Sequence, residues 1–161
     1  LNLQGEVVGL VAAVIGGPAG IGGIGVAVPG DLVAQSIADL ERFGVPQRGW
    51  LGASLISLDE LPPVLLRAVG LTSTQGAMVD RVEPGSPAAR AGLKGAQRDT
   101  QGRLLALGDV ILAVDGVAVK DKADVVRLVA QRRPGDRVRL TLWRDRRRLE
   151  VTVVLMARPR E

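Results

Sequence analysis

The chain has 161 residues and a formal net charge of +4, and it contains neither histidine nor cysteine. Without cysteine it can form no disulfide or thiolate site, and without histidine the usual zinc sites are nearly excluded, so we expect no metal and no cofactor. A hydrophobic content of 47% beside 24% charged residues is typical of a folded protein, and an aromatic content of 2% predicts an aliphatic core.

The first 44 residues predict a β-hairpin followed by a helix. The apolar run Val7–Ile15 predicts a strand, the glycine-rich residues 16–20 predict a turn, and Ile24–Val28 predicts a second strand. The first run is too short to span a bilayer, which needs about 20 apolar residues, so we expect no transmembrane segment. Asp31 is expected to cap a helix that ends at Gly44.

Residues 45–49 are expected to form a linker into a second domain with mixed structure. A strand is expected at Leu51–Ser57. A helix from Asp59 to about Val69 is expected to come next, with two prolines in its first turn. The alternation after this helix predicts another strand at Ala77–Val82.

The middle of this domain predicts short elements separated by turns. Pro87–Ala91 is expected to form a short helix, and the polar stretch Lys94–Arg103 is expected to be a loop. Val110–Val114 predicts a buried strand. The Asp115–Gly116 pair predicts a hairpin turn into a strand at Val117–Val119.

The last part of the chain predicts one helix and two strands. Asp121 is expected to cap a helix over Lys122–Arg133. Apolar and polar residues then alternate around 138–142 and again around 149–155, as half-buried strands should. The turn between these strands is expected at 144–148.

Two blocks of this sequence, Gly76–Leu93 and Leu107–Gly116, resemble a PDZ domain of the bacterial protease type. The opening segments Leu1–Gly9 and Gly22–Pro29 resemble the region just after the catalytic serine loop in the HtrA/Deg (Do-like) family of PDZ-containing trypsin-like serine proteases. With Arg48–Gly52 added, this resemblance covers essentially the whole chain.

The resemblance implies a mostly β fold with helices. Residues 50–158 would form a PDZ-like, partly open β-barrel or sandwich capped by helices. Residues 1–44 would be the hairpin and helix that end a truncated trypsin-like β-barrel, with 45–49 as the linker. The complete protein would be a serine endopeptidase of protein quality control. By the same resemblance it would be a homotrimer or larger assembly in an extracytoplasmic, often periplasmic, location.

The chain by itself is expected to have no protease activity. A Ser-His-Asp triad needs a histidine base to take the proton of the serine, and the sequence contains no histidine. The resemblance also implies that the sequence starts after the nucleophile loop. We therefore expect the recognition function of the family in this chain and its catalytic triad elsewhere.

PDZ domains bind an extended peptide at the edge of a sheet, so the expected partners are peptides and the C-termini of unfolded proteins. The acceptor strand would be Ala53–Ile56, the loop that holds the terminal carboxylate would be Trp50–Ala53, and a helix would form the opposite wall. The candidate peptide-binding residues are Trp50, Leu51, Gly52, Ala53, Ser54, Leu55, Ile56, Val125 and Val129. Arg48 is a candidate contact for a ligand carboxylate, and Leu128 is expected to face the core.

Two alternatives remain at the level of sequence. One is a stand-alone PDZ interaction module with no protease partner. The other is a nucleic-acid binder that uses the arginines of 132–148. The second is weaker, because these arginines fall on outward strand positions and in a turn, with no aromatic platform beside them, so no nucleic-acid partner is expected.

Overall fold

The computed structural model describes residues 1–15 and 24–159. The chain divides into two compact units, Leu1–Gln47 and Arg48–Glu161. In the part of the chain that the structure describes, no helix has the length and apolar character needed to cross a membrane.

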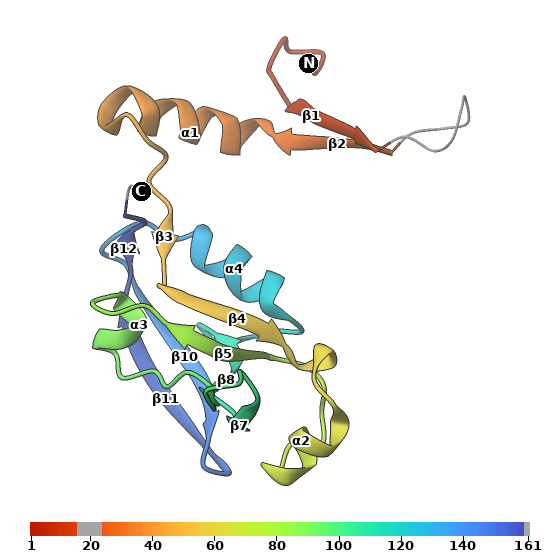
Figure 1. The fold of residues 1–161 in the computed structure, drawn as a ribbon. Coiled ribbons are helices and arrows are strands. Elements are labelled where there is room, and N and C mark those ends of the chain that lie inside the picture. The colour runs from red at the N-terminus through yellow and green to blue at the C-terminus, as the bar shows by residue number, and fades with distance from the viewer. Residues whose placement is uncertain (16–23, 160–161) are drawn as a thin grey trace. The chain divides into compact units, whose positions relative to one another are not determined.

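The first unit is a hairpin followed by a helix (Figure 1). Strands β1 (Gly9–Ile15) and β2 (Ile24–Pro29) pair antiparallel, and helix α1 (Gly30–Phe43) begins directly after β2. The turn expected at residues 16–20 lies outside the described residues. Gly44 ends α1 in a left-handed conformation with φ of 71°, as predicted.

The prediction that Asp31 caps α1 is wrong. Pro29 occupies the capping position, and Asp31 lies in the first turn, where its carboxylate accepts a hydrogen bond from the Leu32 N–H at 2.9 Å. The N–H of Gly30 donates to the carbonyl oxygen of Val8 at 3.0 Å. The hairpin therefore fixes the backbone up to Gly30, and the helix begins as soon as β2 ends.

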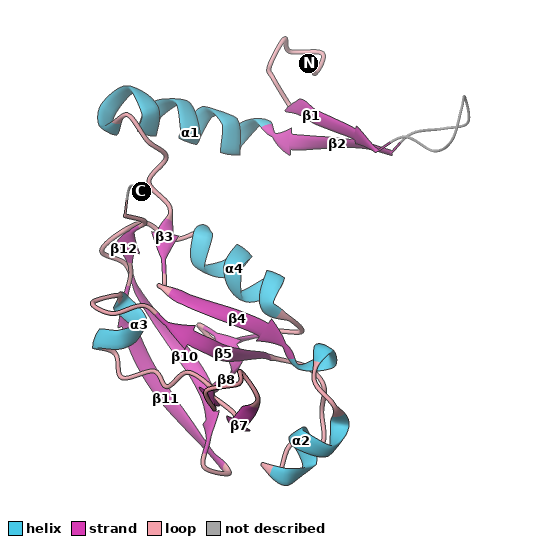
Figure 2. Ribbon diagram, in the orientation of Figure 1, coloured by secondary structure: helices cyan, strands magenta, loops and turns pink. Residues whose placement is uncertain are grey.

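The second unit is built on one antiparallel sheet (Figure 2). The strand order is β11-β10-β8-β5-β4, and the short β9 pairs with β8. The strands of this sheet are β4 (Ala53–Ser57), β5 (Ala77–Val82), β8 (Val110–Val114), β9 (Val117–Ala118), β10 (Arg137–Arg144) and β11 (Arg147–Val154). The sheet does not close, and helices lie against it, which confirms the expected mostly β, partly open PDZ-like fold.

Helices α3 (Pro87–Arg90) and α4 (Lys122–Ala130) and a two-stranded sheet of β3 (Gly49–Trp50) and β12 (Met156–Ala157) add to this architecture. Helix α3 lies beside β11, and helix α4 lies beside β4. Strand β3 pairs with β12, so the beginning and the end of the unit are joined. The structure thus places Gly49 in a strand, although residues 45–49 were expected to be a linker.

Caps and turns in this unit agree with the local sequence. The Asp121 carboxylate accepts the N–H of Asp124 at 2.9 Å and caps α4 as predicted. The Asp115–Gly116 turn has positive φ at both residues, 49° and 81°, as a two-residue hairpin turn requires. Between β10 and β11 the turn is Asp145–Arg146, which is tighter than expected.

The single helix expected from Asp59 to about Val69 is wrong. The structure has a 3₁₀ turn, η1 (Leu58–Glu60), and a short helix, α2 (Pro63–Ala68). Between them Leu61 is extended and Pro62 has ψ of 131°. A residue that precedes proline disfavours the helical conformation, and Leu61 and Pro62 each precede one, so the helix is interrupted there and restarts at Pro63.

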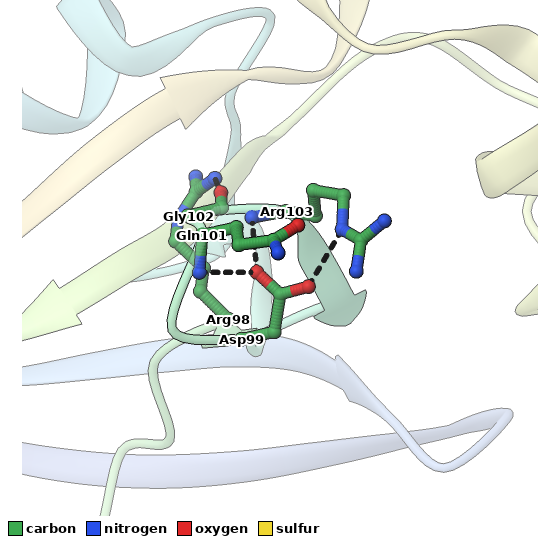
Figure 3. Close-up of polar contacts among 5 residues, drawn as sticks. All are labelled: Arg98, Asp99, Gln101, Gly102 and Arg103. Carbon is green, nitrogen blue, oxygen red and sulfur yellow. Dashed lines mark hydrogen bonds and ion pairs between the residues drawn. The ribbon is translucent and has the colours of Figure 1, made fainter.

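The polar stretch Lys94–Arg103 was expected to be a loop, but it forms part of a small hairpin. Strands β6 (Gln97–Arg98) and β7 (Leu104–Ala106) pair antiparallel. At the tip, the Asp99 carboxylate accepts the N–H groups of Gln101 and Arg103 at 2.9 and 2.8 Å, and the Arg103 Nε at 2.6 Å (Figure 3). The Arg103 side chain, followed by the backbone N–H groups, lowers the pKa of Asp99.

The core of the second unit is aliphatic, as the composition predicts. One cluster lies between α4 and the inward face of the sheet and includes Val138, Leu140 and Leu142, all fully buried. A smaller cluster forms around Leu58 and Met78, and Trp143 packs against it. The strict alternation on β10 therefore places its apolar residues as predicted.

Candidate functional site

A groove of about 220 Å³ is lined by residues of the edge strand β4, the loop before it and helix α4. Among the described strands, β4 is the last in the order and pairs with β5 on one edge, so its other edge faces the groove. Eight of the ten residues expected at a peptide site line this groove: Arg48, Trp50, Leu51, Gly52, Ala53, Leu55, Val125 and Val129.

The loop before β4 directs consecutive N–H groups away from the body of the unit. The Leu51 carbonyl oxygen accepts the Ala88 N–H at 2.9 Å, and the Gly52 carbonyl oxygen accepts the Glu83 N–H at 2.9 Å. In a trans peptide the N–H points opposite to the carbonyl of the preceding residue. The N–H groups of Gly52 and Ala53 therefore point away from α3 and β5, which leaves a pair of donors suited to an anion.

Gly52 cannot be replaced without disturbing this loop. Its φ is +74°, which L side chains rarely adopt. A Cβ at this position would lie 2.8 Å from the Oγ of Ser86 and 2.9 Å from the Cη2 of Trp50. Both the backbone conformation and the close packing on Ser86 therefore require glycine.

Gly49 anchors the beginning of the groove. Its N–H donates to the carbonyl oxygen of Arg132 at 2.7 Å. A Cβ here would lie 2.6 Å from the Cδ1 of Leu155 and 2.7 Å from the carbonyl oxygen of Val129. The loop after Gly49 is thus held between the C-terminal end of α4 and Leu155, which joins β11 to β12.

Helix α4 gives the groove an apolar wall. Val125 and Val129 are 1% and 4% exposed, so they form part of the core as well as of the groove. Val126, which is 60% exposed, also lines the groove and was not expected there. Leu128 is half-buried and packs against the core, in agreement with its expected position.

Two of the expected residues do not contribute side chains to the groove. Ile56 packs against the smaller cluster around Leu58 and Met78, and Ser54 is exposed and does not line the groove. Both residues belong to β4, but their side chains lie outside the groove. The alternation of a strand explains this, because neighbouring side chains point to opposite faces.

Four groove residues were missed from the sequence: Gly49, Val126, Ala130 and Arg158. Val126 and Ala130 are four residues apart on α4, and helical spacing beside Val125 and Val129 could have indicated them. Nothing in the sequence around Arg158 indicated its position, since it depends on the pairing of β12 with β3. Among the described residues, no group of three or more His, Cys, Asp or Glu side chains could hold a metal ion.

The family model described as the PDZ domain matches residues 49–155, which include the loop Trp50–Ala53, β4 and α4. This chain belongs to the PDZ domain family. The open edge of β4 and the helix across from it are thus the parts of a PDZ fold at which the groove lies.

Relatives of this PDZ chain extend the similarity to the first unit. The chain is 32% identical over 99% of its length to a Brucella suis protein named probable periplasmic serine endoprotease DegP-like, of which it covers 28%. It is 35% identical over 89% of its length to a Rhizobium meliloti protein of the same name, of which it covers 26%. The chain therefore spans about a quarter of the length of these curated relatives.

A solved structure gives the same assignment. The HtrA-type protease AlgW with tripeptide matches 98% of this chain and 48% of its own, with a TM-score of 0.68 and 30% identity. The expected resemblance to the HtrA/Deg proteases is confirmed, and the names of the relatives support an extracytoplasmic location.

Proposed function

We propose that the groove binds the C-terminal residues of peptides and unfolded proteins, and that it is the substrate-recognition part of an HtrA/Deg-like serine endopeptidase. The observation that carries this proposal is the direction of the Gly52 and Ala53 N–H groups, which lie at the end of an open strand edge. A relative in this family, AlgW, is described with a tripeptide.

The peptide would add as a strand to the free edge of β4. Each backbone hydrogen bond would contribute about 1 kcal/mol net, and the burial of one aliphatic side chain against Val125 and Val129 would contribute about 1.5 to 3 kcal/mol. Association itself costs several kcal/mol, so a dissociation constant of the order of micromolar is expected.

Peptide-bond hydrolysis would belong to residues outside this chain. A Ser-His-Asp triad depends on a histidine base, and the sequence has none. The first unit supports this separation of catalysis from recognition. Its hairpin and helix expose apolar side chains such as Leu10, Val11 and Ile37, as expected of the last elements of a larger trypsin-like barrel. By its resemblance to the HtrA/Deg family, the whole protein would act as a homotrimer or larger assembly.

A titration with paired peptides tests the proposed site. One fluorescent octapeptide ends in a free valine carboxylate, and its partner carries the same sequence with an amidated C-terminus. We expect the amide to bind at least about tenfold more weakly, because it cannot offer an anion to the two N–H groups. Equal affinities would show that the loop does not bind a terminal carboxylate.

A further inference from the structure

A second cavity, of about 560 Å³, lies in the same unit as the peptide groove. Three segments line it: the end of α2, the chain around the hairpin β6–β7, and the turn between β10 and β11. Figure 1 shows α2 and this turn at the end of the unit away from β3 and β12. None of the described lining residues is shared with the groove, and the volume lies within the range of about 300 to 1,000 Å³ that ligand sites have.

Leu105 gives this second cavity an exposed apolar side chain, because β7 contains a bulge. The hairpin pairs Arg98 with Leu104 and Gln97 with Ala106, so Leu105 is the extra residue of β7. A bulge redirects a side chain, and bulges are frequent beside functional sites. Leu105 lines the cavity and is nevertheless 67% exposed. A ligand in the cavity would cover this apolar surface.

Three half-buried residues, Val69, Leu107 and Trp143, extend the apolar lining. The Nε1 of Trp143 donates to the carbonyl oxygen of Val69 at 3.0 Å, so the indole is fixed against the end of α2. Part of the surface of each residue is accessible from the cavity. Burial of a large apolar ligand side chain here would strengthen binding by about tenfold or more.

The charged residues of the lining favour an anionic ligand. Asp109 is buried and pairs with Arg144 at 2.6 Å, so these two charges offset each other. Lys94 and Arg146 add two exposed cations beside one exposed carboxylate, Asp145. In the described part of the chain, no ion pair joins Lys94 or Arg146 to an acidic side chain. An acidic group on the ligand would therefore complement the charge of the cavity.

Arg146 has a backbone conformation that favours glycine. Its φ is 60° at the second position of a two-residue turn, and the equivalent position of the Asp115 turn is Gly116. The Nη2 of Arg146 donates to the carbonyl oxygen of Ala68 at 2.9 Å, which fixes the guanidinium beside the cavity. An unfavourable conformation that is retained beside a cavity of this size points to a function for the side chain.

We propose that this cavity is a second polypeptide-binding site, which takes a large apolar side chain of an internal segment with Asp or Glu next to it. The apolar side chain would lie against Leu105 and Trp143, and the carboxylate would face Lys94 and Arg146. The choice of a polypeptide as ligand rests on the proposed function, in which this unit recognises unfolded proteins. A substrate that was held both in the groove and in this cavity would bind more tightly than at either site alone.

The two tryptophans of the chain allow the two sites to be observed separately. Trp50 lines the groove and Trp143 lines the second cavity. In the variant Trp50→Phe of the 161-residue chain, Trp143 is the only tryptophan, and its emission reports on ligands in the cavity.

Three peptides that are acetylated at the N-terminus and amidated at the C-terminus test the expected chemistry. Between flanking glycines, the first contains Glu-Phe-Glu, the second Gln-Phe-Gln and the third Glu-Ala-Glu. From titrations of the Trp143 emission, we expect the first peptide to bind about threefold more tightly than the second and about tenfold more tightly than the third. The advantage over the second should shrink at about 500 mM salt. Equal binding of the first peptide and either of the others would overturn the inference.

Matched variants assign the effect to the cavity. Leu105→Ser and Val117→Ser each remove an exposed apolar side chain, but Val117 lines neither the cavity nor the groove. Leu105→Ser should weaken the first peptide by about threefold or more, and Val117→Ser should leave its affinity unchanged. Arg146→Gln should reduce the preference for the first peptide over the second, whereas Arg137→Gln, on the exposed side of β10, should not. Equal effects within either pair of variants would contradict the proposed site.

A competition experiment separates this inference from the proposed function. The fluorescent octapeptide with a free valine carboxylate is bound to the unaltered chain, and an excess of the first capped peptide is added. The anisotropy should stay unchanged, and a fall would place the capped peptide in the groove and overturn the inference. If the free carboxylate is preferred over its amide while no capped peptide changes the Trp143 emission, the proposed function stands and the second site fails. If the capped peptide binds at Trp143 while amidation of the octapeptide has no effect, the second site stands and the carboxylate loop fails.

Discussion

At the scale of single residues, Gly52 combines a strained backbone with a crowded position. The substitution Gly52→Ala adds a Cβ at φ +74° and places it 2.8 Å from the Ser86 Oγ. Gly116 is a matched control, because its φ is +81° and nothing lies within 4 Å of its Cβ position. Gly116→Ala should lower the free energy of unfolding by about 1 to 2 kcal/mol through backbone strain alone. Gly52→Ala should lower it by more, because its Cβ also collides with Ser86.

Only Gly52→Ala should also weaken peptide binding, by about tenfold or more, because the collision moves the loop that carries the two N–H groups. Urea unfolding and titration with the free-carboxylate peptide on both variants measure the two effects. Equal peptide affinities for Gly52→Ala and Gly116→Ala would mean that the loop geometry does not determine binding.

Asp109 is a second residue with a large expected effect. It is 1% exposed, and its carboxylate accepts the Lys94 N–H at 2.7 Å and both Nε and Nη2 of Arg144 at 2.6 Å. The hydrogen bonds with Asp109 raise the pKa of Arg144. The substitution Asp109→Asn leaves this guanidinium without its counter-charge, and we expect a loss of about 3 kcal/mol in the free energy of unfolding.

The exposed ion pair between Arg139 and Glu150, at 3.7 Å, provides the control. Glu150→Gln should change the free energy of unfolding by less than about 0.5 kcal/mol, since both partners are solvated. Urea unfolding of the two variants compares them directly. A loss for Asp109→Asn as small as that for Glu150→Gln would show that the pair contributes nothing specific.

At the scale of elements, local signals predicted most of the second unit. Strands β5 and β8 have the bounds that were expected, and Asp121 caps α4, because alternation and caps depend on neighbouring residues only. The main errors lie at 58–69 and at Gln97–Arg98, which form a strand within a stretch that is otherwise a loop as expected. The first error came from underestimating two consecutive prolines, and the second from treating polar composition as evidence of a loop.

The groove itself was predictable only in part. The PDZ resemblance, together with the helical spacing of Val125 and Val129, indicated these two residues and Gly52. Arg158 enters the groove through the pairing of β12 with β3, a contact between the two ends of the unit. Such long-range pairing leaves no local pattern, so single-sequence reasoning could not find it.

Three of the arginines of 132–148 form ion pairs with carboxylates of the same unit. Arg132 pairs with Asp115, Arg139 lies 3.7 Å from Glu150, and Arg144 is held by Asp109. The backbone N–H of Arg139, followed by the Arg132 side chain, lowers the pKa of Asp115. These ion pairs reduce the charge available to phosphates, which favours the peptide proposal over the nucleic-acid alternative.

At the scale of the whole molecule, the two units differ in how they are stabilised. The second unit has an aliphatic core with fully buried residues on β5, β8 and β10. In the first unit, Asp39 is the only buried residue among those whose side chains are described. Apolar side chains on both its hairpin and its helix are exposed, including Val7, Leu10 and Leu40.

We therefore expect hydrogen exchange to separate the two units. Backbone amides that are hydrogen-bonded in β1 should exchange through local opening that costs little, because two strands and a helix without a buried apolar core give little stability. Amides in β8 should exchange only when the second unit unfolds, since Val110, Ile111 and Val114 are buried. Protection in β1 at least about a hundredfold weaker than in β8 would correspond to a difference of about 2.7 kcal/mol in opening free energy. Equal protection in β1 and β8 would show that the first unit is stable by itself, and its proposed dependence on further elements of a barrel would be wrong.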